Sequence, residues 1–297
     1  MSTLTIAGHV IDTAPQNVGE LRRSRSTDPD LADRLAEDGY LFLPGYLDRE
    51  QVLAARADLL AGMAAAGMIA PGTDPADAIP ASDSGGALMH ELARDSAPLQ
   101  HVLYGPRMIA LYEQLFGEPV RHFDYTWLRM VAPGQGTRPH MDNVFMNRGS
   151  ARLLTAWTPL GDIDRTLGGV TVLAGSHRLE EITSTYAQRD VDVYCSNADD
   201  ADENAGRETL MWSGVLTEDP EGFRAEHGLR WLTTDYRAGD LLTFTMYTAH
   251  GGLDNHSGRF RISSDSRYQP ASEPADPRWI GPDPSAHGSR SKQGVIC

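Results

Sequence analysis

The sequence has almost no lysine, few cysteines and no long apolar run. Of its 26 lysines and arginines only Lys292 is a lysine, so nearly all positive charge is arginine, which binds carboxylates in a bidentate manner. The formal net charge of −15 opposes sequence-independent attraction to nucleic acid or to an anionic membrane. No window approaches the length of a membrane span, and the first residues lack the pattern of a signal peptide. We therefore expect a cytoplasmic protein whose partners include neither nucleic acid nor a membrane.

The two cysteines, Cys195 and Cys297, are too few for a disulfide framework. Their spacing does not suit a pair of metal ligands. We expect them to be reduced, in agreement with a cytoplasmic location, and to take no part in chemistry.

The length of 297 residues and the hydrophobic content of 40% exclude a disordered chain and allow a large buried core. We expect one domain over residues 1–297. Residues 1–28 mix polar, proline and basic residues without periodicity, which predicts an irregular arm, and residues 270–297 form a C-terminal tail. Residues 184–230 contain an acidic stretch with Tyr186, Tyr194 and Trp212 nearby, which predicts either a lid insertion or a solvated surface excursion.

Helical periodicity is confined mainly to the first 120 residues, and strand-like runs follow it. The predicted helices cover 28–38, 49–63 and 106–115, with Asp48 as an N-cap and an apolar stripe of Val52, Leu53, Leu59, Leu60 and Met63. The predicted strands are 40–43, 122–131, 152–158, 170–173, 231–236, 241–247 and 259–268. Residues 67–86, rich in glycine and proline, are interpreted as a long connection or as a loop over a site. Short strands without long helices between them favour an antiparallel sandwich or barrel with flanking helices.

His140 and Asp142 are two residues apart, so on an extended backbone both side chains leave the same face and can bind one cation. His250 follows a later predicted strand. Two imidazoles and one carboxylate on one face of a metal are the arrangement of non-haem Fe(II) oxygenases. The alternative for the first two residues is a hydrogen-bonded pair at a strand end.

Arg261 lies 11 residues after His250 within a strand-like run (261 − 250 = 11). Its guanidinium is suited to holding the far end of a dicarboxylate inside a barrel. The alternative is a structural ion pair with one of the many carboxylates of the chain.

Several segments, taken together in order and spacing, resemble the phytanoyl-CoA dioxygenase (PhyH-like) family of Fe(II)/2-oxoglutarate-dependent oxygenases. They are EDGYLFLP (37–44), RMVAPGQGTRPHMD (129–142), AWTPL (156–160), GGVTVLAGSH (168–177), DYRAGD (235–240), TAH (248–250) and NHSGRFRIS (255–263). The resemblance covers most of the chain.

The resemblance implies a double-stranded β-helix, or jelly roll, which agrees with the strand-rich pattern of residues 122–268. It also implies that His140, Asp142 and His250 bind iron and that Arg261 anchors the distal carboxylate of 2-oxoglutarate. Trp157 occupies a position that lines the cosubstrate site in relatives, although it equally suits the core.

Some relatives use a lysine as a second cosubstrate contact, and this chain has none before Lys292. Tyr125 and Thr137 are the candidates by neighbourhood, and position 252, where relatives carry a hydroxyl, is glycine. Arg129, Asn143 and Arg267 either face the site or are satisfied polar residues of the barrel. His177 and His256 are interpreted as structural.

The family resemblance implies an enzyme that uses Fe(II), 2-oxoglutarate and O2 to oxidise a C–H bond, giving succinate and CO2. Hydroxylation is the expected outcome, and desaturation, epoxidation or cyclisation needs only a different substrate pose. The acidic, lysine-poor composition argues against a CoA thioester and favours a small secondary metabolite. Two alternatives remain: a non-redox metal enzyme with the same ligands, and a catalytically silent 2-oxoglutarate-binding protein.

Overall fold

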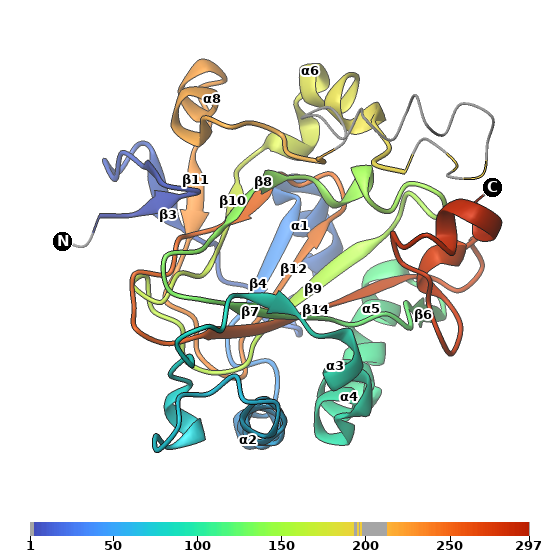
Figure 1. Ribbon diagram of the computed structural model, residues 1–297. Coiled ribbons are helices and arrows are strands. Elements are labelled where there is room, and N and C mark those ends of the chain that lie inside the picture. Colours follow the sequence, from blue (N-terminus) through green and yellow to red (C-terminus); the bar gives the residue numbers. More distant parts are fainter. Residues whose placement is uncertain (1–2, 193–194, 196, 198–212, 297) are drawn as a thin grey trace.

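The computed structural model describes residues 3–192, 195, 197 and 213–296, and Figure 1 shows its ribbon. Most of the described strands belong to two large sheets, and the longer helices lie outside them. The strands are β1 (Thr5–Ile6), β2 (His9–Val10), β3 (Val18–Glu20), β4 (Tyr40–Leu43), β5 (Ala87–Leu88), β6 (Val120–His122), β7 (Trp127–Val131), β8 (Thr137–His140), β9 (Leu154–Pro159), β10 (Val170–Leu173), β11 (Trp231–Thr233), β12 (Leu241–Thr245), β13 (His250–Gly252) and β14 (Arg261–Pro270). The α-helices are α1 (Leu31–Asp38), α2 (Arg49–Ala65), α3 (His90–Asp95), α4 (Ala97–Tyr104), α5 (Pro106–Phe116), α6 (Glu180–Thr183) and α8 (Pro220–Glu226). Shorter helical turns are η1 (Pro75–Asp77), η2 (Asp142–Val144), η3 (Ser176–Arg178), η4 (Tyr186–Gln188), η5 (Pro277–Trp279) and η6 (Ser291–Val295).

The two sheets form the expected jelly roll. Within the described residues the larger sheet has the order β4-β12-β9-β14-β7-β5, with β6 pairing β14, and the smaller has the order β3-β11-β10-β13-β8. All the pairings in the larger sheet are antiparallel, and β3 joins the smaller sheet in parallel to β11. The mainly β fold with flanking helices is therefore confirmed.

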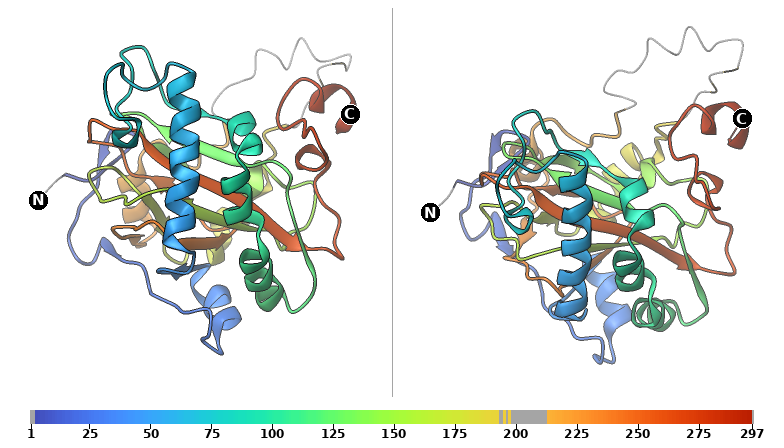
Figure 2. Two further views of the ribbon diagram at one scale, coloured as in Figure 1. Left: turned by 90° about the horizontal axis from the view of Figure 1, so that it is seen from below. Right: turned by 60° about the horizontal axis from the view of Figure 1, so that its bottom comes forward.

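Helices α2 to α5 cover the outer face of the larger sheet, as Figure 2 shows most clearly for α2, whereas α6 and α8 pack with the smaller sheet. Asp48 caps α2 as predicted, since its carboxylate accepts a hydrogen bond from the Gln51 amide at 2.9 Å. Four of the five predicted apolar positions of α2 are buried, but Leu53 is 37% exposed and lies outside the core. This packing gives the sheet a rigid outer wall and leaves its inner face to line the interior of the barrel.

The first residues are more ordered than the sequence suggests. The segment expected to be an irregular arm contains β1, β2 and β3, and Leu4, Ile6 and Ile11 are buried. Strand pairing to β11 at the edge of the smaller sheet organises it, although the segment lacks periodicity of its own. The helices α3 and α4, between residues 90 and 104, were also absent from the expected elements.

Residues 67–86 do not lie over the cluster of histidines described below. Their backbone packs instead beside α2 and the start of β14, where the Ala78 carbonyl accepts a hydrogen bond from the Phe260 amide at 2.8 Å. A loop rich in glycine and proline is recognisable in sequence, but the surface on which it packs depends on tertiary contacts.

Cys195 is disulfide-bonded, so the expected reduced thiol is wrong at this position. Spacing along the sequence does not show which sulfur atoms meet in space. Cys297 lies outside the described residues, as do Tyr194 and Trp212. Among the residues that the structure describes, no helix combines the length and apolar character needed to cross a membrane.

Candidate active site

Strand pairing brings His140, Asp142 and His250 together. His140 ends β8 and His250 begins β13, and the two residues are directly opposite each other in the antiparallel pair. Asp142 begins the turn η2 just after β8. One potential ligand atom from each of the three side chains lies within 4.8 Å of the others. The spacing of two residues in the sequence therefore places the carboxylate beside both imidazoles.

Hydrogen bonds orient both imidazoles toward one point. Nδ1 of His140 lies 2.8 Å from the Arg138 carbonyl, and Nδ1 of His250 lies 2.9 Å from the Thr248 carbonyl. Because a carbonyl oxygen only accepts, each Nδ1 carries the proton and each Nε2 keeps its lone pair. The two Nε2 atoms lie 3.7 and 3.8 Å from Oδ1 of Asp142. The three free donor atoms are those that a metal ion needs.

The second oxygen of Asp142 is held by the larger sheet. Oδ2 accepts a hydrogen bond from the hydroxyl of Thr155 on β9 and another, 3.0 Å long, from Nη2 of Arg267 on β14. The Arg267 guanidinium also lies 3.8 Å from the centre of the Trp127 ring. These contacts leave Oδ1 facing the imidazoles.

The protonation states suit metal binding. Burial, followed by the nearby His250, lowers the pKa of His140 to about 3, and burial lowers the pKa of His250 as well. Burial alone would raise the pKa of Asp142, but Arg267 and the two histidines lower it overall. At neutral pH the site therefore offers two neutral imidazoles and one carboxylate.

A narrow cavity, which we call the inner cavity, lies beside this cluster. The residues that line it are Arg129, Thr137, His140, Trp157, Val170, Phe244, His250, Gly251, Gly252, Arg261 and Asp265. Its free volume is about 20 Å³, so surrounding side chains must move apart to admit a ligand larger than water. Arg261, Thr137 and Trp157 are thus placed together with the two histidines.

Arg261 is a buried cation without a carboxylate partner among the described residues. Its Nη1 donates to the Gly168 carbonyl at 2.7 Å, and its Nε has no hydrogen-bond partner. Burial, and then the positive charge of Arg129, lowers the pKa of Arg261 to about 10. Trp157 Nε1 is also buried without a partner. These unpaired donors fit an anionic ligand in the inner cavity.

Glycine at position 252 keeps the inner cavity open. A Cβ at Gly252 would lie 3.1 Å from the Thr137 hydroxyl and 3.2 Å from Nη1 of Arg261. This chain therefore presents Thr137 and Arg261 to the cavity directly.

A wider space, which we call the outer cavity, also borders the cluster, shares Arg129, Thr137 and His140 with the inner cavity, and has a volume of about 370 Å³. Its lining consists of Leu88, Trp127, Arg129, Gly136, Thr137, Arg138, His140, Asp142, Phe145, Met146, Ser213, Gly214, Val215, Arg267 and His287. Residues 213–215 belong to the predicted lid segment, and His287 comes from the C-terminal tail. Residues from both the predicted lid segment and the C-terminal tail therefore border the site.

Tyr125 lies in neither cavity. Its ring stacks on His90 with a centroid distance of 4.0 Å and contacts Trp127 and Trp279. Asn143 also points away, since its amide donates to the Ala187 carbonyl. His177 and His256 bond to Ala36 and Thr5, respectively, and lie outside the metal cluster as expected.

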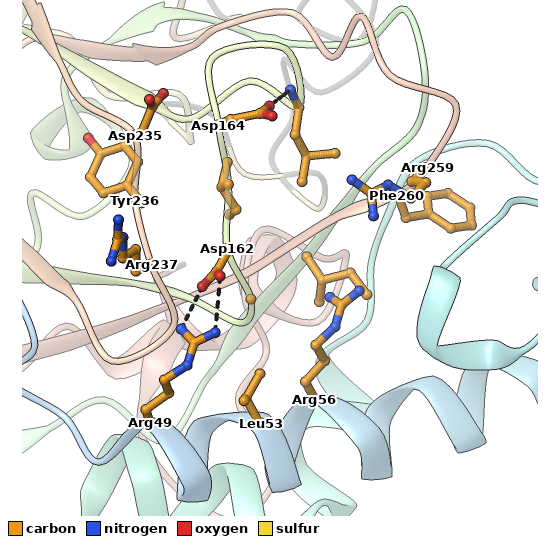
Figure 3. Close-up of a pocket in the computed structure, with 14 residues that line it drawn as sticks. Arg49, Leu53, Arg56, Asp162, Asp164, Asp235, Tyr236, Arg237, Arg259 and Phe260 are labelled. Carbon is orange, nitrogen blue, oxygen red and sulfur yellow. Dashed lines mark hydrogen bonds and ion pairs between the residues drawn. The ribbon is translucent and has the colours of Figure 1, made fainter.

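A separate crevice of about 460 Å³ lies between α2 and the loops before β10, β12 and β14 (Figure 3). Arg49 and Asp162 form an ion pair in it, and Arg56 and Arg259 also line it. It shares no lining residue with the inner cavity, and the buried Tyr236 stands between this crevice and Trp157. Volume alone therefore does not locate the chemistry of this protein.

Comparison with known proteins identifies the family and the fold of this chain. The sequence model described as phytanoyl-CoA dioxygenase (PhyH) matches residues 35–263. The chain belongs to the phytanoyl-CoA dioxygenase family. It is a non-haem Fe(II)- and 2-oxoglutarate-dependent dioxygenase, and its His140, Asp142 and His250 form a cluster suited to iron.

Two similar proteins are the 1-deoxypentalenic acid 11-beta-hydroxylases of Streptomyces arenae and Streptomyces exfoliatus. The first is 29% identical over 281 residues, covering 89% of each chain, and the second is 27% identical over 287 residues, covering 91% of this chain and 90% of its own. Among solved structures, EctD from S. alaskensis with 2-oxoglutarate and 5-hydroxyectoine has a TM-score of 0.59 and 17% identity, covering 98% of this chain and 92% of its own. SnoN, an epimerase solved with Fe3+, alpha ketoglutarate and nogalamycin RO, has a TM-score of 0.57 and 24% identity, covering 86% and 91%. These structures confirm the jelly-roll fold of this family member.

Sequence reasoning missed Thr155, Asp265 and His287. A period of two along β14 could have revealed Asp265, because Arg261, Asp265 and Arg267 are an even number of residues apart and all face the cavities. Thr155 has the same period of two with Trp157 on β9, whereas His287 carries no comparable signal, since its partner Asp192 is 95 residues away.

Proposed function

We propose that this enzyme hydroxylates a C–H bond of a small secondary metabolite, with His140, Asp142 and His250 as its iron ligands. The observation that carries the proposal is the opposition of His140 and His250 across β8 and β13, with Oδ1 of Asp142 facing both Nε2 atoms. Bound Fe(II), 2-oxoglutarate and O2 would supply oxidative decarboxylation: substrate R–H, 2-oxoglutarate and O2 give R–OH, succinate and CO2.

The protein's own residues would bind and orient the reactants. Arg261 would pair with the distal carboxylate of 2-oxoglutarate, because it is a buried guanidinium that lacks a carboxylate partner in the described part of the chain. Thr137 and Trp157 would line the same ligand. Thr155 and Arg267 would keep Asp142 in one orientation while its other oxygen binds the metal.

The outer cavity supports a small substrate with an apolar skeleton. Trp127, Phe145 and Met146 contribute aromatic and thioether surface near the iron ligands. A volume of about 370 Å³ lies in the range of small-molecule sites. The names of the two Streptomyces relatives, hydroxylases of 1-deoxypentalenic acid, agree with such a substrate.

The charge distribution argues against a CoA thioester and against nucleic acid. The net charge is −15, and the exposed Arg138 at the outer cavity already pairs with Glu218 at 3.3 Å. Few cations are therefore available for several phosphates. Because 2-oxoglutarate is an intracellular metabolite, we propose that the enzyme acts in the cytoplasm on a free molecule.

Anaerobic titration of the metal-free protein with Fe(II) and 2-oxoglutarate tests this proposal. We expect a visible metal-to-ligand charge-transfer band in the wild type. The band should be absent in His140→Ala and should need at least tenfold more 2-oxoglutarate in Arg261→Ala. A folded wild-type protein that binds metal but gives no band would contradict the proposal.

A further inference from the structure

Arg129 lies where the two cavities meet. It is on β7, and its side chain, 23% exposed, lines both the inner and the outer cavity. Its Nε donates to Oδ2 of Asp265 on β14 at 2.6 Å. Its terminal nitrogens, Nη1 and Nη2, have no hydrogen-bond partner within the described residues. One edge of the guanidinium is thus fixed, and the terminal donors remain available to a ligand.

The arginines near the inner cavity outnumber their carboxylate partners by one. Arg267 pairs with Asp142 and Arg129 pairs with Asp265, while Arg261 has no carboxylate partner within the described residues. Arg129 and Arg261 therefore face one small space as two cations with a single carboxylate, Asp265, lining it. A dicarboxylate that spans this space would meet one guanidinium at each end.

We propose that Arg129 binds the carboxylate of 2-oxoglutarate at the iron end, while Arg261 binds the distal carboxylate. Asp265 is then a positioning residue that orients the Arg129 guanidinium. This inference rests on the proposed function. It assigns to an arginine the second cosubstrate contact for which the chain has no lysine before Lys292.

The terminal nitrogens of Arg129 suit this role for two reasons. The residue borders the cavity that contains His140 and His250 as well as the one that contains Asp142. Its planar fork of donors is also held in place by Asp265, so less conformational entropy is lost when the terminal nitrogens bind a carboxylate. The hydrogen bond from Nε to Asp265 orients the whole planar guanidinium and so sets the direction in which Nη1 and Nη2 point.

Anaerobic titration of the Fe(II)-loaded protein with 2-oxoglutarate tests the assignment. Arg129→Gln should weaken 2-oxoglutarate binding about 10- to 100-fold and shift the position of the charge-transfer band. Arg129→Lys keeps the positive charge but loses the paired donors of a guanidinium. Its affinity for 2-oxoglutarate should therefore lie between that of Arg129→Gln and that of the wild type. Binding by Arg129→Gln within twofold of wild type would overturn the assignment.

Arg56→Gln is the matched control. Arg56 is also a partly buried arginine, but it faces the crevice of Figure 3 and donates to the Leu160 carbonyl at 3.0 Å. The Arg56→Gln variant should therefore bind 2-oxoglutarate with unchanged affinity and show an unchanged charge-transfer band. An equal loss in Arg56→Gln would indicate a general effect of positive charge and would overturn a direct contact by Arg129.

Asp265→Asn distinguishes the orienting effect of Asp265 on Arg129 from the effect of its negative charge on 2-oxoglutarate. Removal of a negative charge from the inner cavity would by itself strengthen the binding of a dianion. If Asp265 positions Arg129, the variant should instead bind 2-oxoglutarate several-fold more weakly. Tighter binding would overturn the positioning role.

The controls keep this inference distinct from the proposed function. Fe(II) binding and thermal unfolding of each variant establish that the metal cluster and fold persist. A wild-type protein without a charge-transfer band would refute the proposed function itself. A normal wild-type band that is unaffected by Arg129→Gln would refute only the inference about Arg129.

Discussion

The two oxygens of Asp142 have separate tasks. Oδ2 is bound by Thr155 and Arg267, whereas Oδ1 faces the imidazoles. A carboxylate whose second oxygen is bound cannot rotate freely, so the geometry of the ligand set is fixed before metal arrives. The sequence spacing identifies the ligand, but it does not identify what orients it.

Loss of the Thr155 hydroxyl should weaken metal binding. Thr155→Val preserves the shape of the side chain but removes one hydrogen bond to Asp142, so we expect Fe(II) affinity to fall about tenfold. Anaerobic metal titration measures this effect. Thr158→Val is the control, because Thr158 is buried on the same strand and its hydroxyl has no partner. Equal affinities for both variants would contradict the orienting role.

Gly252→Ala should impair cosubstrate binding more than metal binding. Its Cβ would crowd the Thr137 hydroxyl and Nη1 of Arg261, at 3.1 and 3.2 Å, respectively. We expect the dissociation constant for 2-oxoglutarate to rise about tenfold, because a poorly placed charge-assisted contact loses much of its strength. Gly258→Ala, where an added Cβ meets nothing within 4 Å, should bind normally. Unchanged 2-oxoglutarate binding in Gly252→Ala would show that the cavity tolerates the methyl group.

At the scale of elements, β14 combines structure and function through its alternation. The chain positions Arg261, Asp265 and Arg267 on one face of this strand, toward the cavities. The sequence predicted the strand, and the family motif predicted Arg261. The partners of the other two residues could not be predicted, because they come from β7 and η2, more than 120 residues away.

The predicted elements were most accurate where local pattern and tertiary packing agree. Strands 40–43 and 170–173 have the predicted bounds, and α2 starts at its predicted N-cap. The first twenty residues were misjudged because β3 gains its hydrogen bonds from β11, a strand more than 200 residues later. Strand formation by such a short segment depends on its neighbour rather than on its own composition.

The C-terminal tail is attached through a buried ionic cluster. Arg278, in η5, is fully buried and pairs with Asp276 at 2.5 Å and with Asp192 at 2.6 Å. Asp192 also accepts a hydrogen bond from Nδ1 of His287, which borders the outer cavity. The cluster therefore links the tail to the segment that precedes residue 193.

Arg278→Leu should destabilise the protein by about 3–5 kcal/mol, because it leaves the buried Asp276 without its cation and takes one of the cations from Asp192, which keeps His287 and Lys292. Denaturant unfolding measures the change in the free energy of unfolding. Arg290→Leu removes an arginine from the same tail whose partner, Asp283, is exposed, and it should have little effect. Similar losses in the two variants would show that the buried cluster has no special role.

At the scale of the whole molecule, the metal-free protein should lose stability in mild acid. His140 has an unperturbed pKa of 6.5 and a folded-state pKa of about 3. Between these values the unfolded chain takes up a proton that the folded protein excludes, so the free energy of unfolding falls as pH decreases from 6.5 toward 3. Above pH 6.5 this contribution is constant.

Unfolding of the chelator-treated protein between pH 7.5 and 5 checks the expectation. His140→Gln should show a shallower decline than the wild type, by up to about 1.4 kcal/mol per pH unit below pH 6. The difference between the two proteins isolates His140 from the many carboxylates of the chain. Parallel curves would show that His140 is not held neutral by the fold.

The two imidazole ligands also have a mechanical consequence. β8 is an edge strand, and its pairing with β13 is irregular between the pairs His250–His140 and Gly252–Thr137. An ion bound by both histidines would cross-link β8 and β13 where their pairing is irregular. Iron loading should then slow amide hydrogen exchange in the edge strand β8 far more than in β9, which has neighbours on both sides. Bound metal would therefore stabilise the pairing of β8 with β13 locally, in addition to its role in the chemistry.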